Sequence, residues 1–345
     1  MTVLIDIVHP AHVHFYKHIA WNLMRSGVRV VIAARDKDVT CSLLDNYGFA
    51  YETLGKSARN GLVGLAGELL RRDKMLVGLA RRVRAKVILT RNPAGAQVGR
   101  LLRIKSIFDT DDGPAAGLHY YAAAPFAHVI TSPDAMRASL GSKHVKYPGY
   151  KQTAYLHPNH FRPNPEVLGH LGVSRGERYF IVRFVAMVAS HDSGESGLPV
   201  AARLEVVKRL AAHGKVFVSS EAGLPREFTA YHFRPPPHMM HDALAFADLL
   251  VGDSQTMAAE AAVLGTPSLR VSSWKGRLDY LDELETRYGL TESFAPHDIE
   301  HFFERLAVYT RDPGARSAHA RKQERMLADK CDVAAWYTRY VQANF

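Results

Sequence analysis

The chain has 345 residues, more than one hydrophobic core usually serves, so we expect two domains. Hydrophobic residues make up 47% and charged residues 23%, a composition that excludes a disordered or fibrous protein. The sequence has no run approaching the ~20 apolar residues of a membrane span. The two cysteines, Cys41 and Cys331, lie too far apart to suggest a disulfide framework or a thiolate zinc site, and a cytoplasmic protein is expected.

The formal net charge of +10 favours a partner that carries negative charge. Nucleic acid, an anionic membrane and phosphorylated small molecules all meet that description, and a solvated basic surface is the alternative. A nucleic-acid-binding protein is expected to have a recognition helix, a zinc module or aromatic residues within a basic stripe. The sequence has none of these patterns, so we do not expect nucleic acid as a partner.

The first half of the chain predicts repeated strand–helix units. Residues 3–8 form a short apolar run that ends at a His-Pro pair, as a buried parallel strand does. In the helix that follows, Phe15, Ile19 and Leu23 recur every four residues up to Gly27. Further strands are predicted over residues 28–33, 87–90, 106–109 and 128–131. This alternation predicts a parallel sheet covered by helices on both faces.

The prolines within residues 147–165 predict a linker, after which the alternation starts again. Strands are predicted over residues 179–184, 215–219, 249–252 and 268–271, and a long C-terminal helix over 315–341. We therefore predict an α/β fold with two doubly wound domains, residues 1–155 and 166–312, facing a central cleft, and a segment 313–345 that packs back across them. Ligands of such sheets bind at the carboxyl ends of the strands.

Residues 252–267 follow a predicted strand and carry the strongest functional pattern. Ser254 is a helix-capping residue, and the amide groups of Ser254, Gln255 and Thr256 would bind a pyrophosphate at the positive end of the helix. Glu260 lies about one and a half turns further along among alanines, where a carboxylate can accept both hydroxyls of a ribose. The alternative is an ordinary capped helix with one solvated glutamate.

The histidines of residues 9–14 follow the first strand. His12 can contact an anionic ligand or act as a general base, because the pKa of histidine lies near neutrality. A metal site is not expected, because alternate residues at a strand–helix junction point in different directions and no carboxylate or cysteine nearby completes it.

Two further strand ends carry polar residues. Asp109, Asp111 and Asp112 can supply a general base or bind sugar hydroxyls, or they can cap the following turn. In the second domain, Arg183 can clamp a phosphate, and His191 is either an acid–base group or an ordinary loop residue.

Residues 68–86 form a basic amphipathic segment. Its two faces consist of apolar residues (Leu76, Leu79, Ala80 and Val83) and basic ones (Arg71, Lys74, Arg81 and Arg82). Charged helix faces are usually solvated. The alternative is a peripheral contact with an anionic membrane.

Several motifs occur in an order that resembles the domain of unknown function 354 family over nearly the whole chain. They are residues 5–7 with 9–15, 109–112, 182–184 with 189–192, and 256–267, the last being the most specific. That family is similar to the GT-B glycosyltransferase superfamily, which includes the non-hydrolysing UDP-N-acetylglucosamine 2-epimerases.

In those epimerases an Asp-Ser-Gly-Gly stretch precedes a glutamate that holds the ribose. Here Asp253 and Ser254 match its first half, Gln255 and Thr256 replace the glycines, and Glu260 matches the acid. The His-Arg-Arg-Glu-Asn run of the epimerases is matched only loosely by residues 191–195, which lack both arginines.

The resemblance implies a GT-B-type glycosyltransferase of cell-envelope or exported polysaccharide synthesis. Its donor would be a nucleotide diphosphate sugar, with a UDP-sugar expected, and its acceptor a sugar or a lipid-linked sugar. The second domain would hold the donor through Arg183, Ser254, Gln255, Thr256 and Glu260. The first domain would bind the acceptor.

The expected catalytic residues are His12 or Asp112 as the base, and His191. Transfer would need no tightly bound metal or other cofactor, because helix amides and Arg183 would neutralise the leaving diphosphate. The alternatives are epimerisation at C2 of the sugar, with Asp111, Asp112 and His191 as acids and bases, and a non-catalytic nucleotide-sugar-binding protein.

Overall fold

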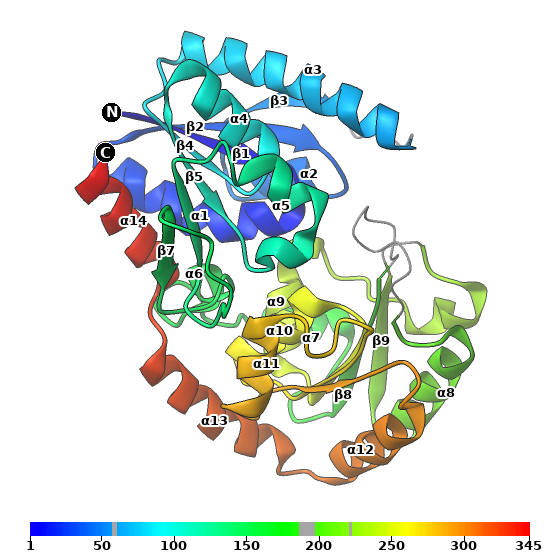
Figure 1. The fold of residues 1–345 in the computed structure, drawn as a ribbon. Helices are drawn as coiled ribbons and strands as arrows, with labels where there is room; N and C mark the ends of the chain where they lie inside the picture. The colour runs from blue at the N-terminus through cyan, green and yellow to red at the C-terminus, as the bar shows by residue number, and fades with distance from the viewer. Residues whose placement is uncertain (57–60, 186–196, 221–222) are drawn as a thin grey trace. The chain divides into compact units, whose positions relative to one another are not determined.

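The computed structural model of the chain describes residues 1–56, 61–185, 197–220 and 223–345. The chain divides into two compact units (Figure 1). Unit 1 comprises Met1–His160 and Lys330–Phe345, and unit 2 comprises Phe161–Asp329.

Unit 1 contains a parallel sheet with seven strands among the described residues, in the order β3-β2-β1-β4-β5-β6-β7. The strands are β1 (Thr2–Ile7), β2 (Arg29–Asp36), β3 (Tyr51–Lys56), β4 (Val87–Thr90), β5 (Lys105–Asp109), β6 (Val129–Pro133) and β7 (His144–Tyr147). The chain winds outward from β1 to β3 and then returns to β4 on the other side of β1. The strand order therefore reverses between β1 and β4.

Helices cover both faces of this sheet, with α3 and α4 on one face and α1 with α14 on the other (Figure 1). The helices are α1 (Pro10–Arg25), α2 (Thr40–Asn46), α3 (Gly61–Arg82), α4 (Pro93–Leu102), α5 (Leu118–Ala123), α6 (Thr153–Leu156) and α14 (Val333–Asn344), with a 3-10 turn η1 (Gly113–Ala116). The predicted apolar face of α3 is confirmed: Leu76, Leu79, Ala80 and Val83 are buried in one cluster with the sheet.

Unit 2 contains a second parallel sheet, with five strands in the described residues in the order β12-β11-β10-β8-β9. The strands are β8 (Tyr179–Phe184), β9 (Lys215–Ser220), β10 (Leu249–Gly252), β11 (Ser268–Val271) and β12 (Glu292–Phe294). After β9 the chain crosses back to the far side of β8, so the order reverses between β8 and β10. Both sheets are doubly wound, which confirms the predicted fold class.

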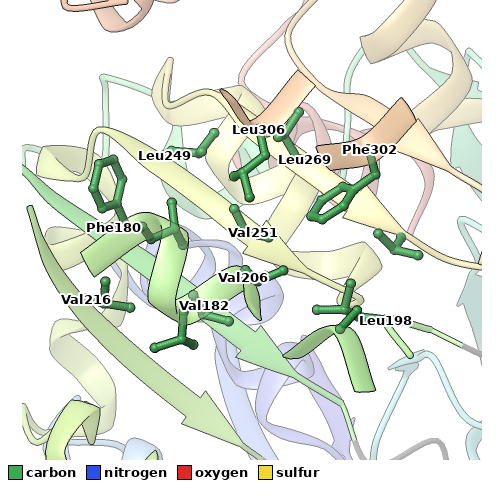
Figure 2. Close-up of a cluster of buried hydrophobic side chains, with 14 of the residues drawn as sticks. Phe180, Val182, Leu198, Val206, Val216, Leu249, Val251, Leu269, Phe302 and Leu306 are labelled. Carbon is green, nitrogen blue, oxygen red and sulfur yellow. The ribbon is translucent and has the colours of Figure 1, made fainter. Parts of the chain in front are cut away.

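The core of unit 2 lies on both faces of this sheet. Figure 2 shows Val182, Val251 and Leu269 of the strands against Val206 of α8 and Phe302 of α12. The opposite face packs against α7, α9 and α10. The helices are α7 (Glu166–Leu171), α8 (Val200–Ala211), α9 (Met240–Phe246), α10 (Gln255–Leu264), α11 (Asp279–Thr286), α12 (Ile299–Arg311) and α13 (Ala315–Asp329), with 3-10 turns η2 (Arg226–Tyr231) and η3 (Pro237–Met239).

The C-terminal helical region predicted over 315–341 consists of two helices. α13 belongs to unit 2 and α14 to unit 1. Asp332 caps the start of α14, because its side chain accepts a hydrogen bond from the amide of Ala335 at 3.0 Å. A capping residue that starts a new helix at this position explains why one continuous helical pattern is interrupted.

The buried strands β4, β8, β10 and β11 have the predicted bounds, whereas β3, β7 and β12 were not predicted. All three lie at the edge of a sheet, so each pairs with a single neighbouring strand. Such strands need no continuous apolar run, so their sequences carry a weak signal. None of the helices in the described residues has both the length and the apolar character that a membrane span needs.

Candidate functional site

The start of α10 lies at the carboxyl edge of the unit 2 sheet, directly after β10. The Ser254 hydroxyl caps this helix by accepting a hydrogen bond from the amide of Met257 at 3.3 Å. Gly265 ends it in the left-handed conformation, with φ of 73°. The predicted capped helix is therefore confirmed. The amides of Gln255 and Thr256 have no partner within the helix, because the first amides of any helix lack one.

A row of three residues crosses the sheet beneath this helix start. Gly252 at the end of β10 pairs in register with Arg183 of β8 and with Arg270 of β11. Residues in register share a face of the sheet. That face is the one covered by α10, because Leu250, two residues before Gly252, packs in one cluster with Met257. Two arginine side chains thus flank a glycine at the point where the strand order reverses.

Gly252 permits a close approach of two strands that any side chain would prevent. A β-carbon there would lie 2.1 Å from the carbonyl oxygen of Arg183. A narrow hollow lies at this position, and its lining residues are Arg183, Leu250, Gly252, Ser254, Ala258, Leu269 and Arg270. The Nη1 atom of Arg183 donates to the Ser219 hydroxyl at 2.6 Å. Two arginines and the positive end of a helix therefore line one hollow, an arrangement suited to an anion.

Asp253 holds the turn between β10 and α10 in place. Its Oδ1 accepts a hydrogen bond from the amide of Val185 at 2.7 Å, and its side chain is almost completely buried. Burial raises the pKa of Asp253 to about 6, although the Val185 amide and Arg203 act in the opposite direction. The first residue of the Asp-Ser pair therefore ties β8 to the start of α10.

Glu260 is only 5% exposed, which excludes the alternative of a solvated glutamate. Its Oε1 lies 3.1 Å from Nε2 of His241, a buried residue in the first turn of α9. Sequence reasoning missed His241, because nothing in the pattern of α9 indicates that it faces an acid on α10. The carboxylate is thus held in a defined position by a second helix.

In unit 1, His12 lies in the first turn of α1, beside the reversal of strand order between β1 and β4. Its Nδ1 faces the amide of Val8 at 3.5 Å. Burial lowers the pKa of His12 well below its ordinary value, and the nearby Arg91 and Lys151 lower it further. The imidazole is therefore neutral at neutral pH, which is the form that can accept a proton.

A buried network of charges surrounds Arg91, which follows β4. The guanidinium pairs with Asp109 and with Asp111, and the Nζ of Lys151 lies 2.5 Å from the second oxygen of Asp111. Asp109 also accepts hydrogen bonds from Tyr337 at 2.7 Å and from Thr131 at 3.0 Å. Sequence reasoning missed Arg91 and Lys151. A charged residue directly after the buried strand 87–90 is the signal that was available for Arg91.

The predicted acids of this strand end differ in their surroundings. Burial acts to raise the pKa of Asp111, but Arg91 and Lys151 hold it well below its ordinary value. Such a carboxylate is a poor proton acceptor at neutral pH. Asp112 is half-buried. After Asp111, Tyr147 and Tyr16, it also acts to raise the pKa of Arg91, and Arg91 in turn acts on His12. Asp112 and His12 are therefore both close enough to Arg91 to interact with its charge.

His191, the remaining predicted catalytic residue, lies outside the described residues, as does the motif 189–192. Across the described ranges, no group of three or more His, Cys, Asp and Glu side chains has an arrangement that could hold a metal ion.

Solved structures with a similar fold include glycosyltransferases and epimerases. The spinosyn rhamnosyltransferase SpnG complexed with thymidine diphosphate matches with a TM-score of 0.67 and 18% identity, over 99% of this chain and 100% of that one. A putative UDP-N-acetylglucosamine 2-epimerase from Listeria monocytogenes matches with a TM-score of 0.70 and 10% identity, over 99% and 95%. The Streptomyces sp. SF2575 glycosyltransferase SsfS6 matches with a TM-score of 0.63 and 13% identity, over 99% of both chains.

These similarities establish a GT-B-like fold of two Rossmann-like domains. Comparison with curated proteins finds no significant match. Residues 1–290 match the family described as "Protein of unknown function (DUF354)". The chain therefore belongs to the DUF354 family, as its motifs indicated.

Proposed function

We propose that this protein is a GT-B-type glycosyltransferase that uses a nucleotide diphosphate sugar, in the cytoplasm, to build cell-envelope or exported polysaccharide. The observation that carries this proposal is the start of α10 beside Arg183, with the buried Glu260 behind it. The diphosphate would lie at the helix amides, and Glu260 would accept the ribose hydroxyls. A UDP-sugar is the donor we propose, and the rhamnosyltransferase SpnG with its thymidine diphosphate supports a nucleoside diphosphate at this fold.

The proposed reaction forms a bond between an acceptor oxygen and C1 of the donor sugar while the bond from C1 to the diphosphate oxygen breaks. The diphosphate leaves with additional negative charge. Arg183 and the amides of Gln255 and Thr256 would stabilise that charge, because they are oriented before the reaction begins. Unit 2 would bind the donor in this scheme, and unit 1 the acceptor sugar or lipid-linked sugar.

The base that takes the acceptor proton would come from unit 1. His12 is the first choice, because its imidazole is neutral at neutral pH and lies beside the reversal of strand order in unit 1. Asp112 is the second choice. A His12→Asn variant is expected to lower the transfer rate about 100-fold or more while the affinity for the donor stays within about twofold. Unchanged transfer by this variant would leave Asp112 as the candidate.

Glu260 provides the direct test of donor binding. Glu260→Gln retains an acceptor for His241 but removes the charge, and it is expected to weaken binding of UDP-sugars about tenfold or more. Glu260→Ala should weaken it further. Isothermal titration with a panel of UDP- and thymidine-diphosphate sugars measures both effects, and Glu205→Gln, on the exposed surface of α8, is the matched control. Equal affinities of wild type and Glu260→Gln for UDP-sugars would show that the charge of Glu260 does not contribute to donor binding and that the residue serves only as a partner of His241.

Epimerisation at C2 is the second candidate, supported by the similarity in fold to the Listeria protein. It requires acids and bases on both faces of one sugar, and Asp111 is engaged by Arg91 and Lys151. Incubation with nucleotide sugars in deuterated water, without acceptor, separates the two reactions. Incorporation of deuterium at C2 would favour epimerisation, and its absence together with transfer to an added acceptor would favour the glycosyltransferase.

We also propose a peripheral contact between the basic face of α3 and an anionic membrane. Arg71, Lys74, Arg81 and Arg82 are exposed on this helix. Each basic residue near such a surface contributes about 1 kcal/mol of attraction. Sedimentation with vesicles rich in anionic lipid tests the contact: replacing Arg71 and Lys74 by Glu should abolish it, and binding that survives this change would exclude it.

A further inference from the structure

Arg270 of β11 is a buried charge with few partners. Its side chain is 2% exposed, and its Nη2 donates to the Ser293 hydroxyl at 3.1 Å. Its Nε and Nη1 find no hydrogen-bond partner in the part of the chain that the structure describes. Buried charges are normally paired and fully hydrogen-bonded, because their removal from water is costly. Arg270 departs from that rule.

Neighbouring acids do not remove this imbalance. Burial lowers the pKa of Arg270, and Tyr280, Glu285 and Asp282 of α11 act to raise it. Their influence is that of charges at a distance, since no ion pair joins Arg270 to a carboxylate within the described residues. An arginine stays protonated at neutral pH even when buried. The guanidinium is therefore a positive charge that the described part of unit 2 leaves largely uncompensated.

Another buried arginine of the same chain shows what a structural role looks like. Arg72 of α3 is 5% exposed, pairs with the buried Asp6, and donates from Nη1 to the carbonyl of Leu54 at 2.7 Å. Its charge is matched by a carboxylate within its own unit. Among the described residues, Arg270 has a single neutral hydroxyl in the corresponding place.

The position of Arg270 indicates what it serves. It lies in register with Gly252, lines the hollow at the start of α10, and shares that hollow with Arg183 and Ser254. We propose that Arg270 is a phosphate-binding residue, and that it forms, with Arg183, Gly252 and the first turn of α10, a site for one phosphate group. Arginine suits this role because its donors remain charged and form strong hydrogen bonds to phosphate oxygens.

Gly252 lines this site, and the backbone of Arg183 approaches it too closely to admit a side chain. This proposal rests on the proposed function in one respect, the identity of the ligand: the phosphate would belong to the diphosphate of the donor sugar nucleotide. Free phosphate and pyrophosphate present the same chemistry, so the experiment includes both sources.

Affinity is the first measurement, made by isothermal titration on the full chain with UDP, thymidine diphosphate and inorganic pyrophosphate. The variants are Arg270→Met, which keeps the length and apolar stem, and Arg270→Lys, which keeps the charge. Arg270→Met is expected to weaken binding of UDP and of pyrophosphate about tenfold or more, and Arg270→Lys less. Equal binding of UDP to wild type and Arg270→Met would overturn the inference.

Thermal unfolding without ligand is the second measurement, because a structural role predicts the opposite result. Arg270→Met removes an uncompensated buried charge, so its unfolding temperature should equal or exceed that of the wild type. Arg72→Met, the matched control, leaves Asp6 buried without its partner and should unfold several degrees lower. An Arg270→Met variant that unfolds several degrees lower and binds pyrophosphate normally would show Arg270 to be structural.

The two hypotheses fail in different ways. If the wild-type protein binds pyrophosphate through Arg270 but binds no nucleoside diphosphate, the phosphate site is supported and the proposed donor is wrong. Wild-type protein that binds UDP independently of Arg270 would keep the donor and overturn this site.

Discussion

Buried arginines near the carboxyl edges of the two sheets have different partners. In unit 1, Arg91 is surrounded by carboxylates: it pairs with Asp109 and Asp111, and Lys151 pairs with the remaining oxygen of Asp111. In unit 2, Arg270 is buried to a similar degree but donates only to a hydroxyl among the described residues. Arg91 directly follows β4, and Arg270 is the last residue but one of β11.

This difference separates a scaffold from a binding site. Opposite charges that are matched within one unit hold adjacent strand ends together, and the removal of one partner leaves the others buried and unpaired. A positive charge without a matching carboxylate gives the folded protein little stability but favours an anion that arrives later. We therefore read the Arg91 network as structural support for His12 and Asp112, and the Arg270 region as the part prepared for a ligand.

The largest expected effect is the loss of the network in unit 1. Arg91→Met leaves Asp109 and Asp111 buried without their main partner, and it should lower the free energy of unfolding by about 3–5 kcal/mol. Urea unfolding followed by circular dichroism measures this loss. Arg100→Met, at an exposed position on α4, should change stability by less than about 0.5 kcal/mol. A comparably small change for Arg91→Met would contradict the distinction between the two regions.

Asp253 provides a test that depends on pH. Burial is the main cause that raises the pKa of Asp253 from 3.8 to about 6. The carboxyl group therefore binds its proton more tightly in the folded state than in the unfolded state. Its contribution to stability is present below pH of about 4 and is lost as the pH rises through about 6. Asp253→Asn cannot ionise and removes this loss.

The stability of Asp253→Asn relative to wild type should therefore rise by up to about 3 kcal/mol between pH of about 4 and about 7. Urea unfolding of both proteins across that range measures the difference. A difference that stays constant with pH would mean that Asp253 is compensated in the way that Asp111 is.

Gly252→Ala tests whether the unit 2 site depends on the close approach of the backbone at Gly252. The new β-carbon would meet the carbonyl oxygen of Arg183 at 2.1 Å, so the strands must shift. We expect a loss of about 1–3 kcal/mol in unfolding free energy and weaker binding of pyrophosphate. Gly78→Ala is the control: the position lies on exposed α3 with nothing within 4 Å, and the change should add about 0.5–1 kcal/mol. Normal stability and binding for Gly252→Ala would remove the steric argument.

Ser254 is the position with the smallest expected effect on stability. Ser254→Ala removes the cap of α10 and should cost about 1 kcal/mol of unfolding free energy. Ser254→Asp can cap the helix equally well but adds a negative charge at the proposed phosphate site. It should therefore keep wild-type stability and lose most of its affinity for pyrophosphate in titration. Retained affinity would argue that the anion lies elsewhere.

Much of the architecture was predictable from local sequence. The apolar runs of β4, β8, β10 and β11 were found with their bounds, as were the Ser254 cap and the Gly265 end of α10. These features depend on interactions between residues close in the chain. The edge strands β3 and β12 were not found, because a strand with one neighbour needs fewer apolar residues.

Part of the candidate site was predictable for the same reason. Arg183, Ser254 and Glu260 stood out because each lies near the end of a recognisable strand or at an unusual place in a helix. His241, Arg91 and Lys151 did not, because their importance comes from partners that are distant in the sequence.

What the amino-acid sequence determined by itself is therefore the set of elements and the residues at their ends. Hydrophobic period, capping side chains and glycine stops act over a few residues and can be read directly. Only the tertiary structure decided which of the buried charges are matched. Arg183, Gly252 and Arg270 come into one row, and Arg91 meets Asp109 and Asp111, solely through strand order and register. Those are set by the packing of whole sheets, and no local pattern encodes them.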